Sequence, residues 1–589
     1  MQLDRPALFL SLFALLTPAP AAAQVPALEF FGTSEGASLG STVERIGDVN
    51  GDGLADFALG APSANVTFLL PFPVPVDDVG RVTIHSGSNG EELWSAAGPI
   101  SAGSQFGAAI TDAGDVNGDG RDDVLIGAPT ADGLVADSGA AYLYSGSDGV
   151  LLRTFLGSQT GEAYGSALCA GELDGDSTSP EAAIGAPNHD IDDSTGGFLQ
   201  EGRVEFVDLA TGAIDGNTPG TPYAWKAPFS TLDRVALRRG WGSQLAYIGD
   251  FSSIGRGTIV ATAPFSEVQG DVLLGDPFQA VNAGFALKYE PFTTYGLFNP
   301  PPPASYGGAG EFLGSVACAL PGDPNGDGVT DWATTVPGAD TIRVYTGAGF
   351  APSTLFSVTG PVADGVQSLA DAGDRNGDGT SDLVFGIPGG GTVTGRVAVA
   401  SGGDGFVFEQ FDLGDPGNRF GSGVAGADMT GNGTSELWIG ARSDDTADVD
   451  AGAVYVFGDS LCPVTASWSN YGTGLSGALS VPSLTSPSNP ILGESFPVEV
   501  GPSTIFNTTA FWLLGGDEQA LPLFGGTLLV DFFQLEAFTL TAFGATLNFA
   551  IPDAPNFCGA DFYLQVLALD NAAPEGVAFS QGMEITLGN

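Results

Sequence analysis

One acidic phrase recurs along this chain and limits the folds that it can adopt. The phrase has the form G-D-x-N-G-D-G-x-x-D, and it stands between two short apolar stretches. Four complete copies occupy Gly47–Asp56, Gly114–Asp123, Gly322–Asp331 and Gly373–Asp382. Weaker copies begin at Glu172, Asp250 and Asp428. Repetition of this kind predicts an architecture in which every copy builds one supersecondary unit.

The spacing of the copies indicates the size of that unit. The seven copies start at positions 48, 115, 172, 250, 323, 374 and 428, which are 51 to 78 residues apart. After each acidic phrase comes a second apolar pair around a Ser-Gly-x-x-Gly turn, as in Gly80–Gly90 and Ala140–Gly149. Four antiparallel strands per repeat are typical of propeller blades. We therefore expect an all-β chain with a seven-bladed β-propeller over residues 24–459.

The two ends of the repeat region predict how the ring closes. The seventh repeat supplies Phe420–Ile439 and Ala451–Phe457, but its fourth strand is missing. An unassigned apolar strand, Leu28–Phe31, lies ahead of the first repeat. We expect this strand to complete the last blade; the alternative is a frayed terminus.

The turn consensus D-x-N-x-D-G-x-x-D is typical of a site for a hard cation. Positions 1, 3, 5 and 9 offer side-chain oxygens, and position 7 offers a backbone carbonyl. Calcium accepts six to eight oxygens in a flexible geometry, whereas magnesium demands a tight octahedron, so we expect Ca²⁺. Glycine at position 6 permits the sharp reversal, often with a positive φ. The expected ligands are Asp48, Asn50, Asp52, Leu54 and Asp56; Asp115, Asn117, Asp119, Arg121 and Asp123; Asp323, Asn325, Asp327, Val329 and Asp331; and Asp374, Asn376, Asp378, Thr380 and Asp382.

The other three turns are less regular. The third keeps Glu172, Asp174, Asp176 and Glu181 but inserts one residue before the last acid, and the seventh has Asp428, Thr430, Asn432 and Glu436. We expect weaker cation binding at both. The fourth turn retains only Asp250, and we expect no cation there. An EF-hand is excluded because its position-12 acid is replaced by Leu59, Ile126, Thr334 and Phe385.

Two further elements of the repeat resemble a known family. Phe106-Gly107 and Phe420-Gly421, together with Gly60–Pro62, Gly127–Pro129 and Gly185–Pro187, resemble the FG-GAP repeats of integrin α-subunit propellers and their bacterial relatives. The resemblance spans about residues 28 to 459. It implies calcium in hairpin loops on one face of a seven-bladed ring and ligand contacts on the other face. Tyr164-Gly165 and Trp241-Gly242 are variants, and Gly440–Arg442 lacks the proline.

The regions outside the repeats have different compositions. Residues 1–23 combine Arg5, an apolar run and an Ala-rich end, which predicts a signal peptide; an uncleaved anchor is the alternative, but the run is short for a span. Residues 460–589 lack acidic turns and alternate apolar strands with Pro/Gly turns, which predicts a small C-terminal β-sandwich. Cys462 and Cys558 could form a disulfide across it. Cys169 and Cys318 occupy equivalent repeat positions, and we expect them to be small buried residues.

Charge and histidine content limit the possible functions. The net charge of −52 repels phosphate backbones, so we expect no nucleic-acid partner and no membrane insertion. Of the two histidines, His85 is expected to be structural, and His189, beside loop acids, is a candidate metal ligand. No nucleophile elbow or zinc cluster is present. We expect a secreted or cell-surface monomer that binds a protein or polysaccharide and is not an enzyme. The alternatives are a calcium-dependent polysaccharide hydrolase or lyase and a purely structural scaffold.

Overall fold

Seven four-stranded antiparallel sheets account for most of the strands in the described part of the repeat region, which confirms the predicted propeller. This computed structural model describes residues 26–69, 73–99, 101–175, 180–192, 198–200, 202–213, 224–225, 240–250, 257–264, 268–269, 279–280, 285–289, 305–306, 313, 315–320, 322–348, 353–359, 365–413, 415–429, 434–458, 466–491, 495–551 and 560–587. The expected signal peptide lies outside these residues. The chain divides into two units, Met1–Phe457 and Gly458–Asn589.

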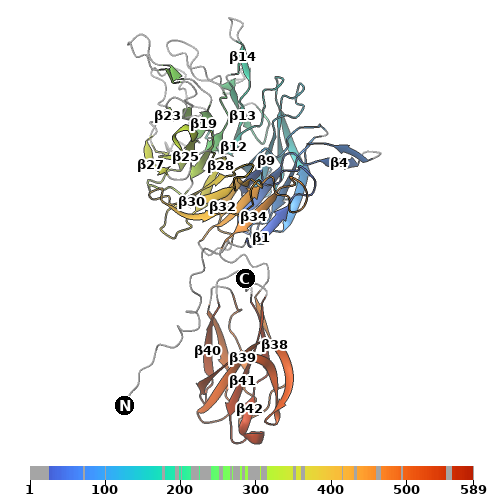
Figure 1. Ribbon diagram of the computed structural model, residues 1–589, viewed down its shortest axis with the longest axis vertical. Helices are drawn as coiled ribbons and strands as arrows, with labels where there is room; N and C mark the ends of the chain where they lie inside the picture. The colour runs from blue at the N-terminus through green and yellow to red at the C-terminus, as the bar shows by residue number, and fades with distance from the viewer. Residues whose placement is uncertain are drawn as a thin grey trace. The chain divides into compact units, whose positions relative to one another are not determined.

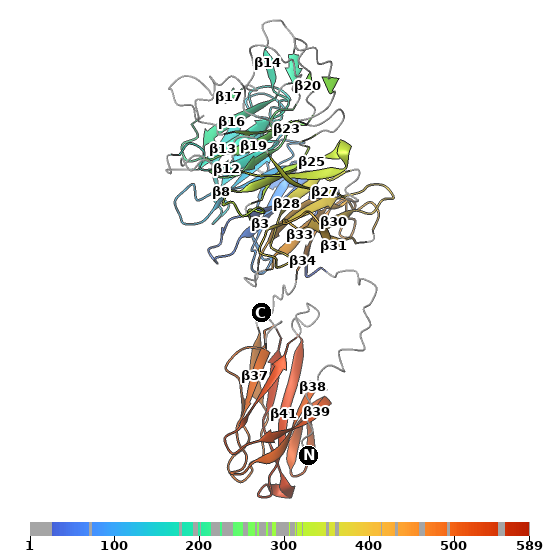
Figure 2. The same ribbon diagram turned by 90° about the vertical axis from the view of Figure 1, so that its left-hand side faces the viewer.

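The innermost strands of the seven sheets form a closed ring. Each contacts the next in chain order, and the last contacts the first. These strands are β2 (Thr42–Ile46), β8 (Ala109–Gly114), β12 (Leu168–Gly171), β18 (Leu245–Tyr247), β24 (Ala317–Leu320), β28 (Ser368–Gly373) and β32 (Phe420–Ala427). Figures 1 and 2 show the colours running around the ring from blue to orange.

The second strand of each blade is an almost continuous apolar run. It packs against neighbouring blades on both faces, so it cannot alternate with polar residues. Six of these strands are buried along their whole length and open on an acidic residue: β3 (Asp56–Ala61), β9 (Asp123–Ala128), β13 (Glu181–Ala186), β25 (Asp331–Val336), β29 (Asp382–Ile387) and β33 (Glu436–Ala441). The seventh, β19 (Ile259–Ala263), is also buried.

The outer pair of strands completes each sheet. The third strands are β6 (Arg81–His85), β10 (Ala140–Tyr144), β16 (Arg203–Asp208), β22 (Phe285–Tyr289), β26 (Thr341–Tyr345), β30 (Arg396–Ala400) and β34 (Ala453–Phe457). The fourth strands of six blades are β7 (Glu92–Ala97), β11 (Leu151–Leu156), β17 (Ala224–Trp225), β23 (Ser305–Tyr306), β27 (Thr354–Thr359) and β31 (Val407–Phe411). The short 3-10 helix η3 (Pro337–Ala339) links β25 to β26.

The fourth strand of the last blade comes from the other end of the propeller sequence. Strand β1 (Leu28–Phe31) pairs antiparallel with β34, with Leu28 opposite Val456 and Phe31 opposite Ala453. Figure 1 shows the orange β34 beside the blue β1. The Phe30 ring stacks on Trp438, with ring centroids 5.1 Å apart. The predicted ring closure is therefore confirmed.

The FG and GAP glycines meet where one blade packs on the next. A Cβ on Gly60 would lie 2.3 Å from the carbonyl oxygen of Gly107 in the following blade, so only glycine allows this approach. The aromatic residue that precedes the glycine of the aromatic-glycine motif fills the space between two blades. These residues are Phe106, Tyr164, Trp241 and Phe420, and each is at most 1% exposed. The variant aromatic-glycine pairs therefore occupy the places that the repeat predicted for them.

The loop between β3 and β6 contains an additional two-stranded hairpin. Strand β4 (Val66–Leu69) pairs with β5 (Pro73–Val76), and Figure 1 shows this hairpin projecting from the ring. Two similar hairpins occur in the corresponding loops of the third and fourth blades: β14 (Asp190–Asp192) with β15 (Phe198–Gln200), and β20 (Val268–Gln269) with β21 (Gln279–Ala280).

The C-terminal unit is a β-sandwich, as predicted. One sheet contains β35 (Ser467–Tyr471), β43 (Gly582–Thr586), β41 (Asp561–Leu569), β38 (Thr508–Leu523), β39 (Gly526–Leu540) and β42 (Val577–Phe579). The other contains β36 (Leu484–Thr485), β37 (Ser495–Val500) and β40 (Ala545–Ala550). A 3-10 turn, η5 (Pro574–Gly576), precedes β42. Trp512 and Phe549 from the two sheets meet edge to face, 5.4 Å apart, in a shared apolar core.

The cysteine predictions have two outcomes. Cys169 is buried on β12, and Cys318 is partly buried at the same place on β24; both are free thiols. Burial raises the pKa of the Cys169 thiol to about 12, which keeps it protonated and unreactive. Cys462 and Cys558 lie outside the described residues. Within those residues, no helix has the length and apolar character needed to cross a bilayer.

Candidate metal-binding turns

The acidic turns join the first and second strands of their blades. Because adjacent strands in a blade are antiparallel, the turn between the third and fourth strands emerges at the same end. The acidic turn and a Ser-Gly or Thr-Gly turn therefore face each other in every complete repeat. The loops between the second and third strands, and the links between blades, emerge at the opposite end.

Position 1 of the turn organises the loop backbone. The Asp48 carboxylate accepts hydrogen bonds from the amides of Asp52 and Gly53 at 3.1 and 2.8 Å. Asp115, Asp323 and Asp374 accept the equivalent bonds in their own turns. Glycine at position 6 has a φ of +90°, +83°, +85° and +87° in the four complete copies, which confirms the expected positive φ. The side chain at position 1 thus folds the loop around its own oxygens.

Positions 3, 5 and 7 are linked in series. The Asn50 Oδ1 atom accepts from the Asp52 amide at 2.8 Å, and the Asp52 carboxylate accepts from the Leu54 amide at 3.0 Å. Arg121, Val329 and Thr380 at position 7 donate their amides in the same way. Position 7 therefore contributes an N–H group to the loop. The carbonyl contact expected of it stays a prediction.

Position 9 is a buried carboxylate that connects two turns. Asp56 is 0% exposed, and its oxygens accept from the amides of Val49 and Gly87 at 2.9 and 2.8 Å. Asp123, Asp331 and Asp382 accept equivalently from Gly146, Gly347 and Gly402. Burial raises the pKa of Asp56 to about 6, and has the same effect on its three counterparts. A nearby cation favours the ionised form of such a carboxyl.

The Ser-Gly and Thr-Gly turns are the part of the site that sequence reasoning missed. Besides the glycine amide, each turn brings a hydroxyl to position 5: Ser86 lies 3.4 Å from Asp52, and Thr346 lies 3.2 Å from Asp327. Ser147 and Ser401 play this part at Asp119 and Asp378. The recurrence of a hydroxyl residue and glycine one hairpin after every complete acidic phrase is the available signal. By itself that pattern indicates only a turn.

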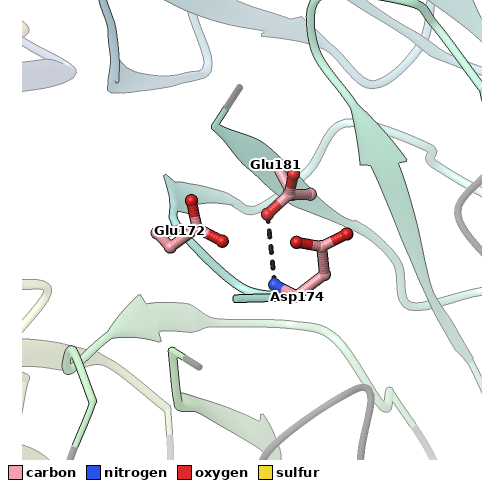
Figure 3. A group of neighbouring side chains, drawn as sticks. All are labelled: Glu172, Asp174 and Glu181. Carbon is pink, nitrogen blue, oxygen red and sulfur yellow. Dashed lines mark hydrogen bonds between the residues drawn. The ribbon is translucent and has the colours of Figure 1, made fainter. Parts of the chain in front are cut away.

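Two turns bring three carboxylates together in the described part of the chain. The ligand oxygens of Asp323, Asp327 and Asp331 lie within 4.8 Å of one another, and so do those of Glu172, Asp174 and Glu181. Figure 3 shows the second group converging, with the Asp174 amide donating to Glu181 at 3.3 Å. Burial, together with the charges of Asp174 and Glu172, raises the pKa of Glu181 to about 8. Such like charges repel one another unless a cation lies among them.

The third turn is more complete than its irregular sequence indicates. One residue is inserted before its last acid, and that acid is glutamate, whose longer side chain reaches the same group. Asp176 lies outside the described residues. The clustering of these acids shows that the site geometry tolerates the insertion.

The seventh and fourth turns differ from the others. Glu436 is 0% exposed, its Oε2 accepts from the Met429 amide at 2.7 Å, and its buried Oε1 has no hydrogen-bond partner among the described residues. Burial raises the pKa of Glu436 to about 7. This orphaned oxygen fits a cation ligand. Thr430 and Asn432 of the seventh turn lie outside the described residues.

In the fourth turn, Asp250 is the last residue of its described segment, so the expected absence of a cation there stays a prediction.

The two histidines pack against protein groups. His85 is buried, and its ring nitrogens lie 3.0 Å from the Gly90 carbonyl and 3.1 Å from the Thr83 hydroxyl, which confirms a structural role. His189 Nδ1 contacts the buried carboxylate of Glu162, which also lies 3.5 Å from Arg203. His189 therefore belongs to a group of polar side chains around the buried Glu162 carboxylate, together with Arg203. The side chains of the loop acids Asp192 and Asp193 lie outside the described part of the chain, so metal binding by His189 stays a prediction.

Part of this chain is similar in sequence to known proteins. A family model described as the FG-GAP repeat matches residues 45–85 and 107–144, within the first two blades. Integrin alpha-5 of Xenopus laevis is 33% identical over 179 residues, which are 29% of this chain and 15% of that protein. Integrin alpha-PS2 of Drosophila melanogaster is 36% identical over 182 residues, 28% of this chain and 12% of that protein. The match thus spans less than a fifth of each relative.

A solved structure also aligns with the chain. Sqt1 from Chaetomium thermophilum covers 74% of this chain and 90% of its own, at 11% identity and a TM-score of 0.35. A score this low supports no conclusion about fold or function.

Proposed function

We propose, from its FG-GAP repeats and its distant similarity to integrin alpha subunits, that this chain is a secreted calcium-binding propeller that binds an extracellular protein or polysaccharide. It acts as a monomeric binding or adhesion module and not as an enzyme. The net charge of −52 makes nucleic acid an unfavourable partner.

The observation that carries the calcium assignment is the convergence of three carboxylates at a turn. The Glu172 group and the Asp323 group each offer three oxygens within 4.8 Å. Oxygen-only donors on a flexible loop suit calcium, whose six to eight ligands include backbone carbonyls and water. Buried position-9 carboxylates with raised pKa values favour a resident cation, because a cation removes the cost of ionising them.

The loops at the opposite end of the blades are the proposed recognition surface. Loops on a rigid scaffold are where binding residues concentrate. The β4–β5 hairpin is the most distinctive of these loops: Val74 is 43% exposed, and Phe68 is partly exposed. The sequence places two more apolar residues in this loop, Leu70 and Phe72, and both lie outside the described residues. Exposed apolar side chains of this kind often mark a partner surface.

A binding array tests the proposal. The purified protein is applied to immobilised glycans and matrix proteins in calcium and, separately, in EDTA. We expect binding in calcium that is lost or strongly reduced in EDTA, with a melting temperature several degrees lower in EDTA. Binding to no surface component in calcium, or an identical melt in both buffers, contradicts the proposal.

Replacing residues 65–76 by a short Gly-Ser linker tests the hairpin separately. We expect loss of the ligand found on the array, with unchanged calcium content and melting temperature. A matched control replaces the hairpin of the third blade between residues 190 and 200. Retained binding in the first variant, or its unfolding, excludes the β4–β5 hairpin as the recognition surface.

A further inference from the structure

An open depression of about 680 Å³ lies at the end of the blades opposite the acidic turns. It is bordered by three consecutive blades, the sixth, the seventh and the first, and so it spans the seam where the ring closes. Its lining consists of three glycines, three serines, two aspartates and two arginines. Among the described residues, no apolar side chain lines it.

The two arginines come from the seventh blade. Arg419 precedes the aromatic residue of the FG motif, and Arg442 follows β33 where other repeats have the proline of GAP. Both side chains line the depression, and burial, with the charge of Arg419 as a second cause, lowers the pKa of Arg442. In the described part of the chain, neither forms an ion pair with a carboxylate; Arg442 donates to Gln367 at 3.4 Å.

The fold does not require these two arginines. Arg419 has a φ of +56°, and the equivalent residues Gln105 and Ala163 have +55° and +59°, so this backbone geometry belongs to the repeat. At the place of Arg442, other blades have Pro62 and Pro129. The chain has 17 basic against 69 acidic residues, and yet two of the 17 meet here with no carboxylate partner among the described residues. A guanidinium group that forms no ion pair with a carboxylate can donate charge-assisted hydrogen bonds to an anionic ligand.

The rest of the lining distinguishes between anionic ligands. Ser38, Ser63 and Ser443 offer hydroxyls, and Asp78 and Asp450 offer carboxylate acceptors. Those groups suit a ligand that carries many hydroxyls. A peptide would leave its apolar side chains without a pocket, because the described lining is polar throughout. A long polyanion would meet the repulsion of the whole chain, whereas a single anionic group interacts mainly with the charges of the lining, Arg419, Arg442, Asp78 and Asp450, since charges beyond about 8 Å are screened at physiological salt.

We propose that this depression binds an acidic saccharide, with Arg419 and Arg442 holding one carboxylate or sulfate and the serines and aspartates holding sugar hydroxyls. This inference rests on the proposed binding function, and it names the ligand class and the site.

Titration calorimetry on the calcium-loaded full chain tests it. The probes are three tetrasaccharides of one backbone: one with a single terminal uronate, one with a single sulfate and one that is neutral. We expect the two charged sugars to bind and the neutral sugar to bind at least ~10-fold more weakly, because charge-assisted hydrogen bonds are lost. The two charged arms show whether carboxylate or sulfate is preferred.

Variants locate the site. Arg419→Gln copies the residue at the equivalent position of the second blade, and Arg442→Gln removes the other charge. We expect each to weaken the charged sugars by about 10- to 100-fold while the neutral sugar and the melting temperature stay unchanged. Arg343→Gln on β26 removes the same charge away from the depression and should bind as the parent does. If Arg419→Gln lowers the melting temperature, it is replaced by Arg419→Ser, which copies Ser38 of the first blade.

Three results overturn the inference: equal affinity for charged and neutral sugars, parent-like binding by both variants, or displacement of the sugar by a glutamate-rich peptide that binds more tightly. The proposed function stands or falls separately. If the array detects a calcium-dependent ligand but the two variants still bind the charged sugars, only the site assignment fails. If the array detects nothing while the charged sugars bind through these arginines, the inference holds and the adhesion role fails.

Discussion

Individual carboxylates decide how this propeller responds to its surroundings. The acids of a complete turn have two distinct roles. The carboxylate at position 1 accepts hydrogen bonds from backbone amides within an exposed loop, and the carboxylate at position 9 is buried between two turns. The repeated consensus predicted both as cation ligands. Their different burial follows from the packing of whole blades, so a linear pattern could not show it.

Neutralising one acid of the fifth turn should separate two effects on stability: the repulsion among its carboxylates and the stabilisation by bound calcium. We expect Asp327→Asn to lose one calcium and to melt a few degrees lower in calcium, since a site filled to about 100 times its Kd stabilises by ~2.7 kcal/mol. In EDTA the same variant should melt no lower than the parent, because it removes a repelling charge. Calorimetric melts and bound-metal analysis check both. Asp340→Asn, an exposed acid of the same blade, is the control.

Glu44 on the inner strand β2 should make stability depend on pH. Burial and the Asp112 carboxylate raise the pKa of Glu44 from 4.5 to about 8. The folded state therefore binds this proton more tightly than the unfolded state, and its contribution to stability is present below pH 4.5 and is lost as the pH rises through about 8.

Glu44→Gln cannot ionise, so it should melt a few degrees higher than the parent near pH 9 and about equally near pH 4. Thermal melts at the two pH values, with calcium saturating, measure the difference. Glu91 is exposed, so the variant Glu91→Gln is the control for the effect that removing one negative charge has on the melting temperature. A pH-independent difference between Glu44→Gln and the parent contradicts the assignment.

At the scale of elements, contacts between blades explain why the repeat keeps its aromatic-glycine and Gly-Ala-Pro motifs. The Gly60 backbone approaches Gly107 of the next blade, and Phe106 fills the space beside it with 0% exposure. The number of strands, the ring closure and the glycine geometry could all be predicted from the sequence, because every blade repeats the same sequence motifs and the same local contacts. The β4–β5 hairpin and the Arg419–Arg442 pair could not, since each belongs to one loop and depends on distances between blades.

Phe106→Ala measures what one blade interface contributes. Truncating a fully buried phenylalanine should destabilise the propeller by about 3–5 kcal/mol, through lost burial and the cavity that remains. Phe406, 68% exposed in a turn of the sixth blade, is the matched control, and Phe406→Ala should change the free energy of unfolding by less than about 0.5 kcal/mol. Denaturant unfolding followed by tryptophan fluorescence separates the two. Similar losses would mean that the aromatic position does not hold the blades together.

For the whole molecule, the ring depends on a strand of four residues. Strand β1 covers the outer edge of β34 and places Phe30 against Trp438 and His85. An uncovered strand edge pairs readily with other chains. The seventh blade is therefore the place where the propeller is easiest to open.

Deleting residues 26–31 should lower the melting temperature of the propeller by several degrees and cause concentration-dependent association through β34. Light scattering and calorimetry follow the two effects. A synthetic peptide of residues 26–33 should reverse both, because it supplies the missing strand. Glu29→Ala, at an exposed position of β1, should behave as the parent. A monomeric, equally stable deletion variant would show that β1 does not close the ring.

The pairing of β1 with β34 also sets an order of events during synthesis. Residues 28–31 leave the ribosome hundreds of residues before their partners at 453–456. Contacts between such distant segments are slow to form. The earliest strand of the propeller must therefore wait, unpaired, until the last one arrives. A chain stopped at any blade short of the seventh has an open seam, so completion is an all-or-none step that only the finished propeller sequence can take.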